Sequence, residues 1–493
     1  MTQTPDSAVL LSLLDRATDV RVLCVGDVML DRFISGSVDR ISPEAPVPIL
    51  RVEDEAHMLG GVGNVARNIA AIGATAEVVT VVGDDPAGSD VAGLFKDNPG
   101  IDAHLIADSE RRTAIKTRYI GGTQQLLRAD RESPSVLSDM SAAKIVAAAK
   151  KAMKRCAVLV LSDYGKGVLS PAVIGELIDL ARKAGIPVIV DPKGRDFWRY
   201  QGADVVTPNR RELAEAVGHP TNAESEIVDG AKSLIIDNDL GAVLVTRSQD
   251  GMTLVSAEGT VDHLQAEARE VFDVSGAGDT VVAALAAGRA AGASWVDAAA
   301  LANVAAGIAV AKVGTAVAFA DDIVQALHHQ DRERSGAKVL GLEQLKDRVS
   351  VWRRGGKKVG FTNGCFDLLH PGHVSLLAQA RAACDRLIVG LNSDSSVRAL
   401  KGEGRPVQNE ASRSAVLASL GSVDAIVLFS DETPIELIRA LKPDVLVKGA
   451  DYTVETVVGS DIVLGYGGRV VLADLEDGHS TTGTIARMSG EKP

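Results

Sequence analysis

Short apolar runs rich in β-branched residues alternate with longer amphipathic stretches along the first two-thirds of the chain. Each run ends in Gly, Asp, Pro or Asn, which predicts strands at 21–30, 78–83, 157–165, 187–193, 205–209 and 242–251. Helical patterns lie between several of these strands, so we expect an α/β domain with a mainly parallel sheet. Such sheets gather ligand-binding groups at the carboxyl ends of their strands. The sequence places Asp27, Asp163, Asp191, Lys193, Asn209 and Arg247 there.

The same alternation restarts on a smaller scale after a polar and charged run, HHQDRERSGAK, at 328–338. It predicts a second α/β unit with strands at 358–364, 386–394, 425–430, 445–449 and 469–474. A chain of 493 residues is too long for one compact core. We therefore expect domains at 1–328 and 341–493, joined by a linker at 329–340.

Composition narrows the classes of protein that fit. Hydrophobic residues make up 46% of the chain and aromatic residues only 3%, so Ala, Val, Leu and Ile must fill cores of the kind found in helix-covered parallel sheets. A formal net charge of −13 argues against nonspecific binding to nucleic acid or anionic membranes. Local basic pockets for phosphorylated metabolites remain compatible with it.

Location and membrane contact follow from three further features. The segment 1–20 has no basic region before its short apolar part, so we expect no signal peptide. The weakly polar run 298–311 is too short to span a membrane and predicts a buried helix. Four scattered cysteines lack paired metal-ligand spacing, which indicates free thiols in a reducing compartment and a cytoplasmic protein.

The stretch DVSGAGDT, at 273–280, precedes a long Ala-rich helical run. Gly276 and Gly278 let backbone N–H groups converge at a helix start, where the helix dipole favours a phosphate. Asp279 follows directly and is placed to take a proton from a hydroxyl that attacks a phosphoryl group. The competing interpretation is a solvated Asp that caps a helix.

A second glycine-rich stretch, GGVGNVARN at 60–68, suits close approach of a ligand to the backbone at Gly60 and Gly61. Asn64 can donate to and accept from sugar hydroxyls. Asp27 and Asp31 add carboxylates for the same hydroxyls, although a turn or a helix cap explains Asp31 equally well.

The segment FTNGCFDLLHPGHVSLLAQA, at 361–380, carries the chemistry of the second domain. His370 and His373 lie three residues apart at the start of an amphipathic helix, so both can face a triphosphate near its positive end. A zinc site is the alternative, but no third His or Cys ligand is spaced nearby.

The combination of GGVGN, DVSGAGDT and TPNRRE (207–212) resembles the ribokinase-like family of sugar kinases over residues 15–325. The resemblance implies a ribokinase-like α/β fold with Asp279 as the catalytic base. It also implies an anion hole at Gly276, Ala277 and Gly278. Asn209 and Glu212 would organise Mg²⁺ through water. ATP would be bound by Lys193, Asn209, Thr246 and Asn303.

Three narrower stretches, 38–50, 161–167 and 191–194, resemble kinases of heptose 7-phosphate. A phosphorylated sugar needs cations near its distal end. The candidates are Arg40, Lys116, Arg118 and Arg128, with Arg40 and Arg128 placed first because they lie in the best-matched text. The predicted sugar-phosphate site is therefore Asp27, Arg40, Gly60, Gly61, Asn64 and Arg128.

The HPGH element resembles the HxGH motif of a nucleotidyltransferase superfamily with a smaller Rossmann-like fold. Matches continue at 392–407, 445–452 and 476–482. The resemblance implies catalytic roles for His370, His373 and Lys401. It implies nucleotide binding by Asn363, Gly364, Phe366, Asp367, Arg405, Lys448, Ser480, Thr481 and Thr482. The text Leu475-Glu-Asp-Gly departs from the Arg-Thr-x-Gly of cytidylyltransferases and favours the adenylyl branch.

Both halves, in this order, resemble the family of bifunctional heptose 7-phosphate kinases and heptose 1-phosphate adenylyltransferases. That resemblance implies ATP as a substrate of both domains, Mg²⁺, and a cytoplasmic homodimer formed through the kinase domain. One alternative is a kinase and nucleotidyltransferase for another sugar phosphate or nucleotide. Another is that one domain is a non-catalytic ligand sensor.

Overall fold

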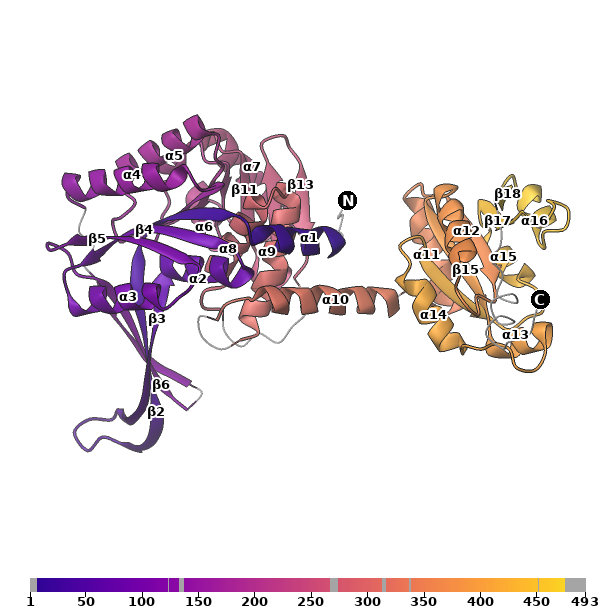
Figure 1. The fold of residues 1–493 in the computed structure, drawn as a ribbon, viewed down its shortest axis with the longest axis horizontal. Coiled ribbons are helices and arrows are strands. Elements are labelled where there is room, and N and C mark those ends of the chain that lie inside the picture. Colours follow the sequence, from indigo (N-terminus) through magenta and orange to yellow (C-terminus); the bar gives the residue numbers. More distant parts are fainter. Residues whose placement is uncertain are drawn as a thin grey trace. The chain divides into compact units, whose positions relative to one another are not determined.

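The computed structural model describes residues 7–122, 124–132, 137–266, 274–312, 316–336, 338–450 and 452–474. The chain forms two compact units, Met1–Leu327 and His328–Pro493 (Figure 1). Helix α10 (Ala320–Gly336) runs through much of the polar segment for which the sequence predicts a linker. The domain limits at 328 and 341 stay a prediction.

The first unit is built on a nine-stranded sheet. The strand β12 runs in the opposite direction to the other eight. Every strand predicted for this half contributes to it, although residues 28–30 of the first predicted strand belong to a second sheet. The carboxyl ends of the parallel strands form one edge. In spatial order the strands are β13 (Val261–Leu264), β12 (Met252–Ser256), β11 (Ala242–Thr246), β10 (Val205–Val206), β9 (Val188–Asp191), β8 (Val158–Ser162), β1 (Arg21–Gly26), β4 (Thr75–Gly83) and β5 (Ile101–Asp108).

Helices cover both faces of this sheet because its strands alternate between two cores. Val22 and Cys24 of β1 pack into one core, whereas Leu23 and Val25 pack into the other. The first core is covered by α1 (Ser7–Ala17), α2 (Val62–Ile72), α3 (Pro86–Lys96), α8 (Ala277–Ala290), α9 (Trp295–Val310) and α10. The second is covered by α4 (Asp139–Met153), α5 (Pro171–Ala184), α6 (Arg210–Val217) and α7 (Glu224–Asn238).

Alanine and glycine let α8 and α9 pack closely, as the low aromatic content predicts. A Cβ atom placed on Gly288 of α8 would lie 3.3 Å from the Cα atom of Ala298 in α9. The buried helix predicted at 298–311 is confirmed as α9. This packing fixes α8, and with it Asp279, against the sheet.

A second sheet of four strands projects from the first unit (Figure 1). We call it the lid; its order is β3 (Pro48–Gly61), β2 (Val28–Ile41), β6 (Ala114–Gly121) and β7 (Gln124–Arg131). Asp27 alone separates β1 from β2, so the lid begins where the central strand ends. The sequence did not predict the lid as a separate sheet, and the stretch 38–50 lies at its far end.

The second unit has a five-stranded parallel sheet, and all five of its predicted strands are present. Its order is β16 (Ala425–Phe429), β15 (Arg386–Asn392), β14 (Val359–Gly364), β17 (Val445–Gly449) and β18 (Arg469–Ala473). The strand order reverses between β14 and β17, where Rossmann-like sheets bind ligands. Among the described residues of either unit, no helix has the length and apolarity needed to cross a membrane.

Helices again cover both faces. One core is closed by α11 (Leu342–Arg354), α15 (Ile435–Leu441) and α16 (Ser460–Gly465). The other is closed by α12 (Pro371–Ala382) and α14 (Glu410–Ser419). A short helix, α13 (Asp394–Lys401), follows β15 and carries Lys401 toward the carboxyl ends of the strands.

Candidate active sites

Asp279 lies in the first turn of α8, and two side chains hold its carboxylate. Asn64 of α2 donates to Oδ2 at 2.7 Å, and the Tyr164 hydroxyl donates to Oδ1 at 2.7 Å. Gly276 caps the helix with a left-handed φ of 79°, which favours glycine. The first-turn N–H groups have no intrahelical acceptor, as an anion site needs, although Ala277 donates its N–H to the Val274 carbonyl at 3.3 Å.

Burial raises the pKa of Asp279 to about 6, against the hydrogen bonds from Tyr164 and Asn64, which lower it. The buried carboxylate is therefore mostly ionised at neutral pH, yet it is more basic than an ordinary aspartate. A general base works best when its pKa lies near the working pH. The site favours a base over the alternative of a solvated cap.

Asn64 is held in place by hydrogen bonds that involve Asn68 and Thr280. The Asn68 side chain donates to the Asn64 carbonyl at 3.0 Å, and Thr280 donates to the Asn68 side-chain oxygen at 3.0 Å. The predicted glycines allow the close approach of α2: a Cβ atom on Gly60 would lie 2.6 Å from Asp31, and one on Gly61 would lie 2.3 Å from the Asp27 carbonyl. Asn64 therefore lies against Asp279, whereas Gly60 and Gly61 lie against Asp31 and Asp27.

Asp27 is fully buried, and its carboxylate accepts three backbone hydrogen bonds. The donors are the N–H groups of Tyr164, Lys166 and Val168, at 2.9–3.0 Å. The sequence predicts that Asp27 holds sugar hydroxyls. In this geometry it also fixes the loop that carries Tyr164 to Asp279. Its contact with sugar hydroxyls stays a prediction.

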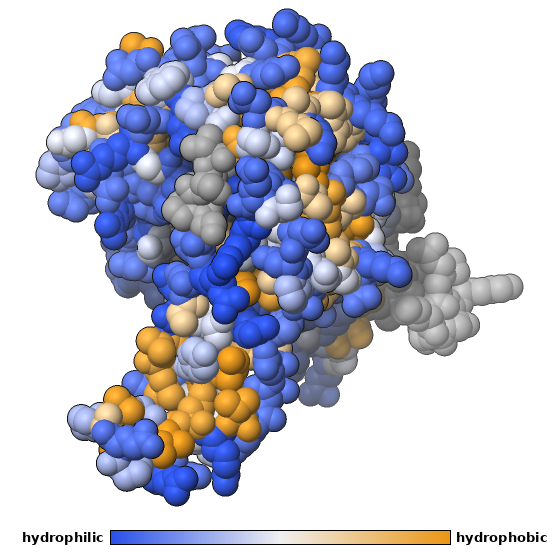
Figure 2. Space-filling model, turned by 90° about the vertical axis from the view of Figure 1, so that its left-hand side faces the viewer, coloured by the Kyte–Doolittle hydropathy of each residue, from blue (hydrophilic) through white to orange (hydrophobic). Residues whose placement is uncertain are grey.

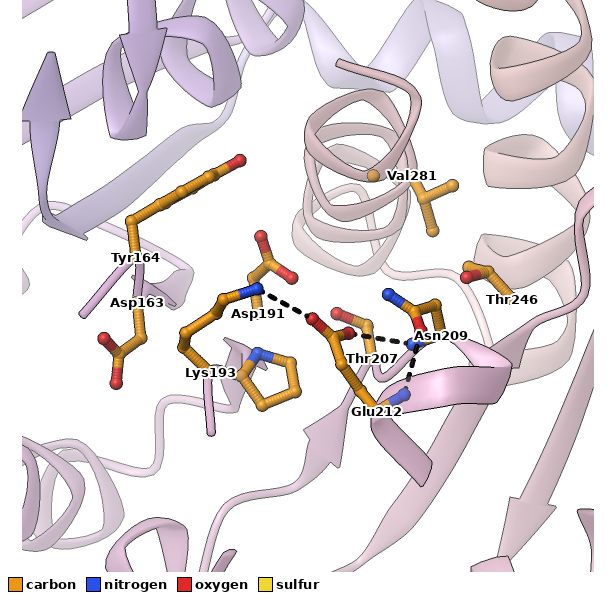
Figure 3. Close-up of a pocket in the computed structure, with 11 residues that line it drawn as sticks. Asp163, Tyr164, Asp191, Lys193, Thr207, Asn209, Glu212, Thr246 and Val281 are labelled. Carbon is orange, nitrogen blue, oxygen red and sulfur yellow. Dashed lines mark hydrogen bonds and ion pairs between the residues drawn. The ribbon is translucent and has the colours of Figure 1, made fainter. Parts of the chain in front are cut away.

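A pocket opens beside the start of α8, which carries Asp279 (Figure 3). Lys193, Asn209 and Thr246, all predicted to bind ATP, line it together with Gly278. A Cβ atom on Gly278 would meet no described atom within 4 Å, so the absent side chain leaves room beside the helix start. Asn303 does not line this pocket; its side chain donates to the Gln265 carbonyl at 2.9 Å.

Asn209 and Glu212 form a reciprocal capping box at the start of α6. The Asn209 side chain accepts from the Glu212 N–H, and the Glu212 side chain accepts from the Asn209 N–H. Lys193 donates to the other Glu212 oxygen at 3.2 Å (Figure 3). In the part of the chain that the structure describes, no group of three or more His, Cys, Asp or Glu is arranged as a metal cage.

Asp191 faces the same pocket from the end of β9. Burial raises its pKa well above the ordinary value, and the negative charges of Asp279 and Glu212 raise it further. Oxygen donors crowded in this way suit Mg²⁺, which binds through one or two carboxylates together with nucleotide phosphates. The residues present therefore fit the metal that the resemblance implies.

The predicted phosphate-binding cations are spread widely over the lid. Arg40 is exposed and pairs with Ile49 near the end of β2, far along the strand from Asp27. Arg128 donates to Asp130 at 3.0 Å, and Arg118 donates to Asp31 at 2.9 Å. Lys116 lies over the Tyr164 ring, 5.5 Å from its centroid. The structure brings Lys116 close to Asp279 and leaves Arg40 remote.

In the second unit, His370 and His373 stack at the start of α12. Their ring centroids are 3.8 Å apart, and the Phe366 ring lies 5.1 Å from His373. Burial and, to a smaller extent, the neighbouring His370 lower the pKa of His373 to about 4. His373 is therefore neutral at physiological pH and acts as a hydrogen-bond donor or acceptor.

A pocket at the reversal point brings most predicted residues of this unit together. Asn363, Gly364, Phe366, Asp367, His373, Lys401 and Lys448 line it. Lys448 donates to the Asn363 carbonyl at 2.9 Å, which ties β17 to β14. Asp367 is buried and accepts from Arg405 and from the N–H groups of Val407 and Gln408, so it fixes the loop that carries Arg405.

Some predictions fall outside the described residues. Ser480, Thr481 and Thr482 lie there, as do Asp273 and the text at 475–478 that favours the adenylyl branch. Conversely, the sequence assigned no role to Tyr164 or Arg413. Arg413 is buried and donates to the carbonyls of Cys365, Asn392 and Gln408. The position of Tyr164, two residues after β8, could have indicated a role at the site. No local sequence pattern marks Arg413.

Comparisons with known proteins match the two units separately. Residues 20–322 match the pfkB family of carbohydrate kinases, and residues 361–476 match the cytidylyltransferase-like family. Phosphofructokinase-2 from Escherichia coli has the same fold, with a TM-score of 0.54, 21% identity, and coverage of 64% of this chain and 100% of that one.

Two relatives match almost end to end. The bifunctional protein HldE of Rhodospirillum rubrum is 57% identical over 99% of this chain and 98% of its own length. That of Caulobacter vibrioides is 57% identical over 95% of this chain and 96% of its own length.

Fold and site together define an enzyme with two activities, a sugar kinase in the first unit and a nucleotidyltransferase in the second. Because the similarity to these relatives extends over nearly the whole chain, the family of the protein can also be stated. It belongs to the family of bifunctional HldE proteins.

Proposed function

We propose that this protein makes ADP-heptose in two separated steps. The first unit phosphorylates D-glycero-D-manno-heptose 7-phosphate at the anomeric hydroxyl with ATP, which gives the 1,7-bisphosphate. A separate phosphatase removes the 7-phosphate. The second unit then joins heptose 1-phosphate to the adenylyl group of ATP and releases pyrophosphate. ADP-heptose would supply glycosyltransferases of the lipopolysaccharide core.

The observation that carries the first activity is the setting of Asp279. Its carboxylate is held by Asn64 and Tyr164 at a helix start beside the nucleotide pocket. There Asp279 accepts the proton of the anomeric hydroxyl as the hydroxyl oxygen bonds to the γ-phosphorus and the bond to ADP breaks. The N–H groups at the start of α8 stabilise the charge on the transferred phosphoryl group.

Mg²⁺ would be held at Asp191 and Glu212, with Asn209 acting through water, and would neutralise charge across the nucleotide phosphates. Lys193 lies beside Glu212 in the same pocket and adds a positive charge next to those phosphates. The protein groups themselves orient the nucleotide and keep the attacking hydroxyl in line with it.

In the second unit, the phosphate oxygen of heptose 1-phosphate attacks the α-phosphorus of ATP, and pyrophosphate leaves. His370 and His373 lie at the start of α12, where the helix dipole and their ring N–H groups stabilise the charge that builds on the phosphates. Lys401 lines the same pocket and would neutralise the leaving pyrophosphate.

The two activities should be separable by single substitutions. Asp279→Asn removes the base, so sugar phosphorylation should fall by three orders of magnitude or more while adenylyl transfer is kept. His370→Ala should do the reverse. Each activity is measured on the full chain, the kinase by ADP release and the transferase by pyrophosphate release. Unchanged kinase turnover in Asp279→Asn would refute the base assignment.

The substrate assignment is tested by incubating the protein with heptose 7-phosphate, ATP, Mg²⁺ and a phosphatase. The mass of the product is then measured by mass spectrometry. A mass equal to ADP-heptose supports the proposal. Turnover of a different sugar phosphate or nucleotide in a substrate panel would replace it. ATP binding without turnover in one unit would make that unit a sensor.

We also propose a homodimer formed through the lid and a cytoplasmic location. Apolar side chains are exposed on the lid (Figure 2), among them Ile41, Val47, Val52 and Leu127, each more than half exposed. A second copy of this chain is the partner that would cover them, because such patches mark interaction sites. The four free cysteines support a reducing compartment.

A further inference from the structure

A row of charged side chains crosses the base of the lid above the kinase site. In β6, Lys116 lies opposite Asp31 of β2 and Asp130 of β7. Two residues on, Arg118 lies opposite Phe33 and Arg128. Directly opposed residues point to the same face of a sheet, and so do residues two apart. These side chains therefore share the lid face that carries Lys116 to Tyr164.

Three of the nearby cations form ion pairs with a carboxylate. Arg118 pairs with Asp31 at 2.9 Å and Arg128 with Asp130 at 3.0 Å. Lys166, on the loop below, pairs with Glu132 at 2.5 Å. Among the described residues, no carboxylate lies within ion-pair distance of the Lys116 ammonium, although its side chain is partly buried.

Leaving an ammonium half-buried without an anion is costly. Burial lowers the pKa of Lys116 below its ordinary value. The negative charges of Asp31 and Asp130 oppose this shift, and the positive charges of Lys166 and Arg128 add to it. Only the Tyr164 ring, a weak partner for a cation, lies against it. An anion bound at Lys116 would relieve this cost, so this position favours a ligand that carries a negative charge.

The position of Lys116 shows which part of a ligand it faces. Lys116 lies against the face of the Tyr164 ring, the hydroxyl of this ring donates to Asp279, and the charge of Lys116 lowers the pKa of Asp279. Lys116 comes from the lid and does not line the nucleotide pocket, which is lined by residues of β9, α6, β11 and α8 and by Asp163 and Tyr164. A monosaccharide whose reacting hydroxyl meets Asp279 would extend its far end across Tyr164.

We infer that Lys116 is the receptor for the distal phosphate of the sugar substrate. This inference rests on the proposed function, because it assumes a sugar that already carries a phosphate. It places Lys116 ahead of Arg40 and Arg128, the two candidates placed first from the sequence. Arg40 is exposed far along β2, and Arg128 pairs with Asp130.

The test compares two sugars in the full chain. Lys116→Met keeps the length of the side chain and removes its charge. For heptose 7-phosphate, kcat/KM should fall about ten- to a hundredfold, as loss of a charge-assisted contact predicts. For the same heptose without phosphate it should change little. The preference for the phosphorylated sugar should therefore collapse. Lys116→Arg should restore part of it.

Lys150→Met is the matched control, because Lys150 is an exposed lysine on α4; it should keep the preference. An equal loss for both sugars in Lys116→Met would overturn the inference and leave Lys116 a general support of Asp279. A higher KM for ATP with an unchanged sugar preference would assign Lys116 to the nucleotide and overturn it as well.

Failure of the proposed function gives a different result. If the wild-type chain does not phosphorylate heptose 7-phosphate, the substrate proposal is wrong. Calorimetric binding of inorganic phosphate then tests the site directly. Weaker binding to Lys116→Met than to wild type and Lys150→Met supports the anion site, and equal binding by all three refutes it.

Discussion

The carboxylate of Asp279 shows how one residue is tuned by opposing effects. Burial raises its pKa to about 6, and hydrogen bonds from Tyr164 and Asn64 limit the rise. The same donors fix both oxygens in space, so the base is oriented before substrate arrives. A group that is both basic and fixed suits proton transfer at neutral pH.

Removing one of these donors should change the pH profile of the kinase. In Tyr164→Phe the ionised form of Asp279 loses a hydrogen bond, so its pKa should rise and the acid limb of kcat should move up by about one pH unit. Tyr466→Phe is the control, because it also removes a tyrosine hydrogen bond but lies in the second unit. A lower kcat with an unmoved acid limb would show that Tyr164 only supports the fold.

For single residues, the sequence indicated the candidate catalytic side chains better than it indicated the hydrogen bonds that hold them. Asp279, Asn64 and His373 sit in short motifs whose spacing is itself the signal. The hydrogen bond between Tyr164 and Asp279 joins residues 115 positions apart, and no local pattern encodes it. The three backbone hydrogen bonds that Asp27 accepts are likewise long-range, because their donors lie more than 130 residues away in the sequence.

At the scale of elements, strands of the two main sheets were predictable because burial on both faces makes them continuous apolar runs. The lid was not. Ten of the fourteen residues of β2 are at least partly exposed, so the strand has no apolar run to mark it. Its pairing with β6 joins Asp31 to Lys116, a long-range contact that periodicity does not reveal.

The lid also supplies a test of the proposed dimer. Leu127 is 59% exposed on β7, and Leu127→Asp would place a charge in the proposed interface. Wild type should sediment as a dimer and Leu127→Asp as a monomer at micromolar concentration. Ile236→Asp, at an exposed apolar position of α7, should remain dimeric. A dimeric Leu127→Asp would place the interface elsewhere.

For the whole molecule, the two units should respond to acid in opposite directions. The pKa of Asp279 is raised in the folded state, so the first unit binds more protons folded than unfolded and gains stability as pH falls through about 6. Asp191 acts in the same sense. The pKa of His373 is lowered to about 4, so the second unit loses stability as pH falls from 6.5 toward 4.

Calorimetry of the full chain between pH 4.5 and 7 measures this difference if each unit gives its own transition. Asp279→Asn should flatten the dependence of the first transition and raise its stability near pH 7 by up to about 3 kcal/mol, the equivalent of its shift in pKa. His373→Gln should flatten the second. Slopes unaltered by both substitutions would contradict the burial effects described above.

Each unit also contains its own described catalytic groups. Asp279, Asn64 and Tyr164 come from the first unit, and His373 and Lys401 come from the second. Evolution can therefore separate or rejoin the two reactions by gene fission and fusion without rebuilding either site. Covalent linkage guarantees equal numbers of the two sites in the cell, and a lineage that needs unequal numbers can obtain them by splitting the gene near α10.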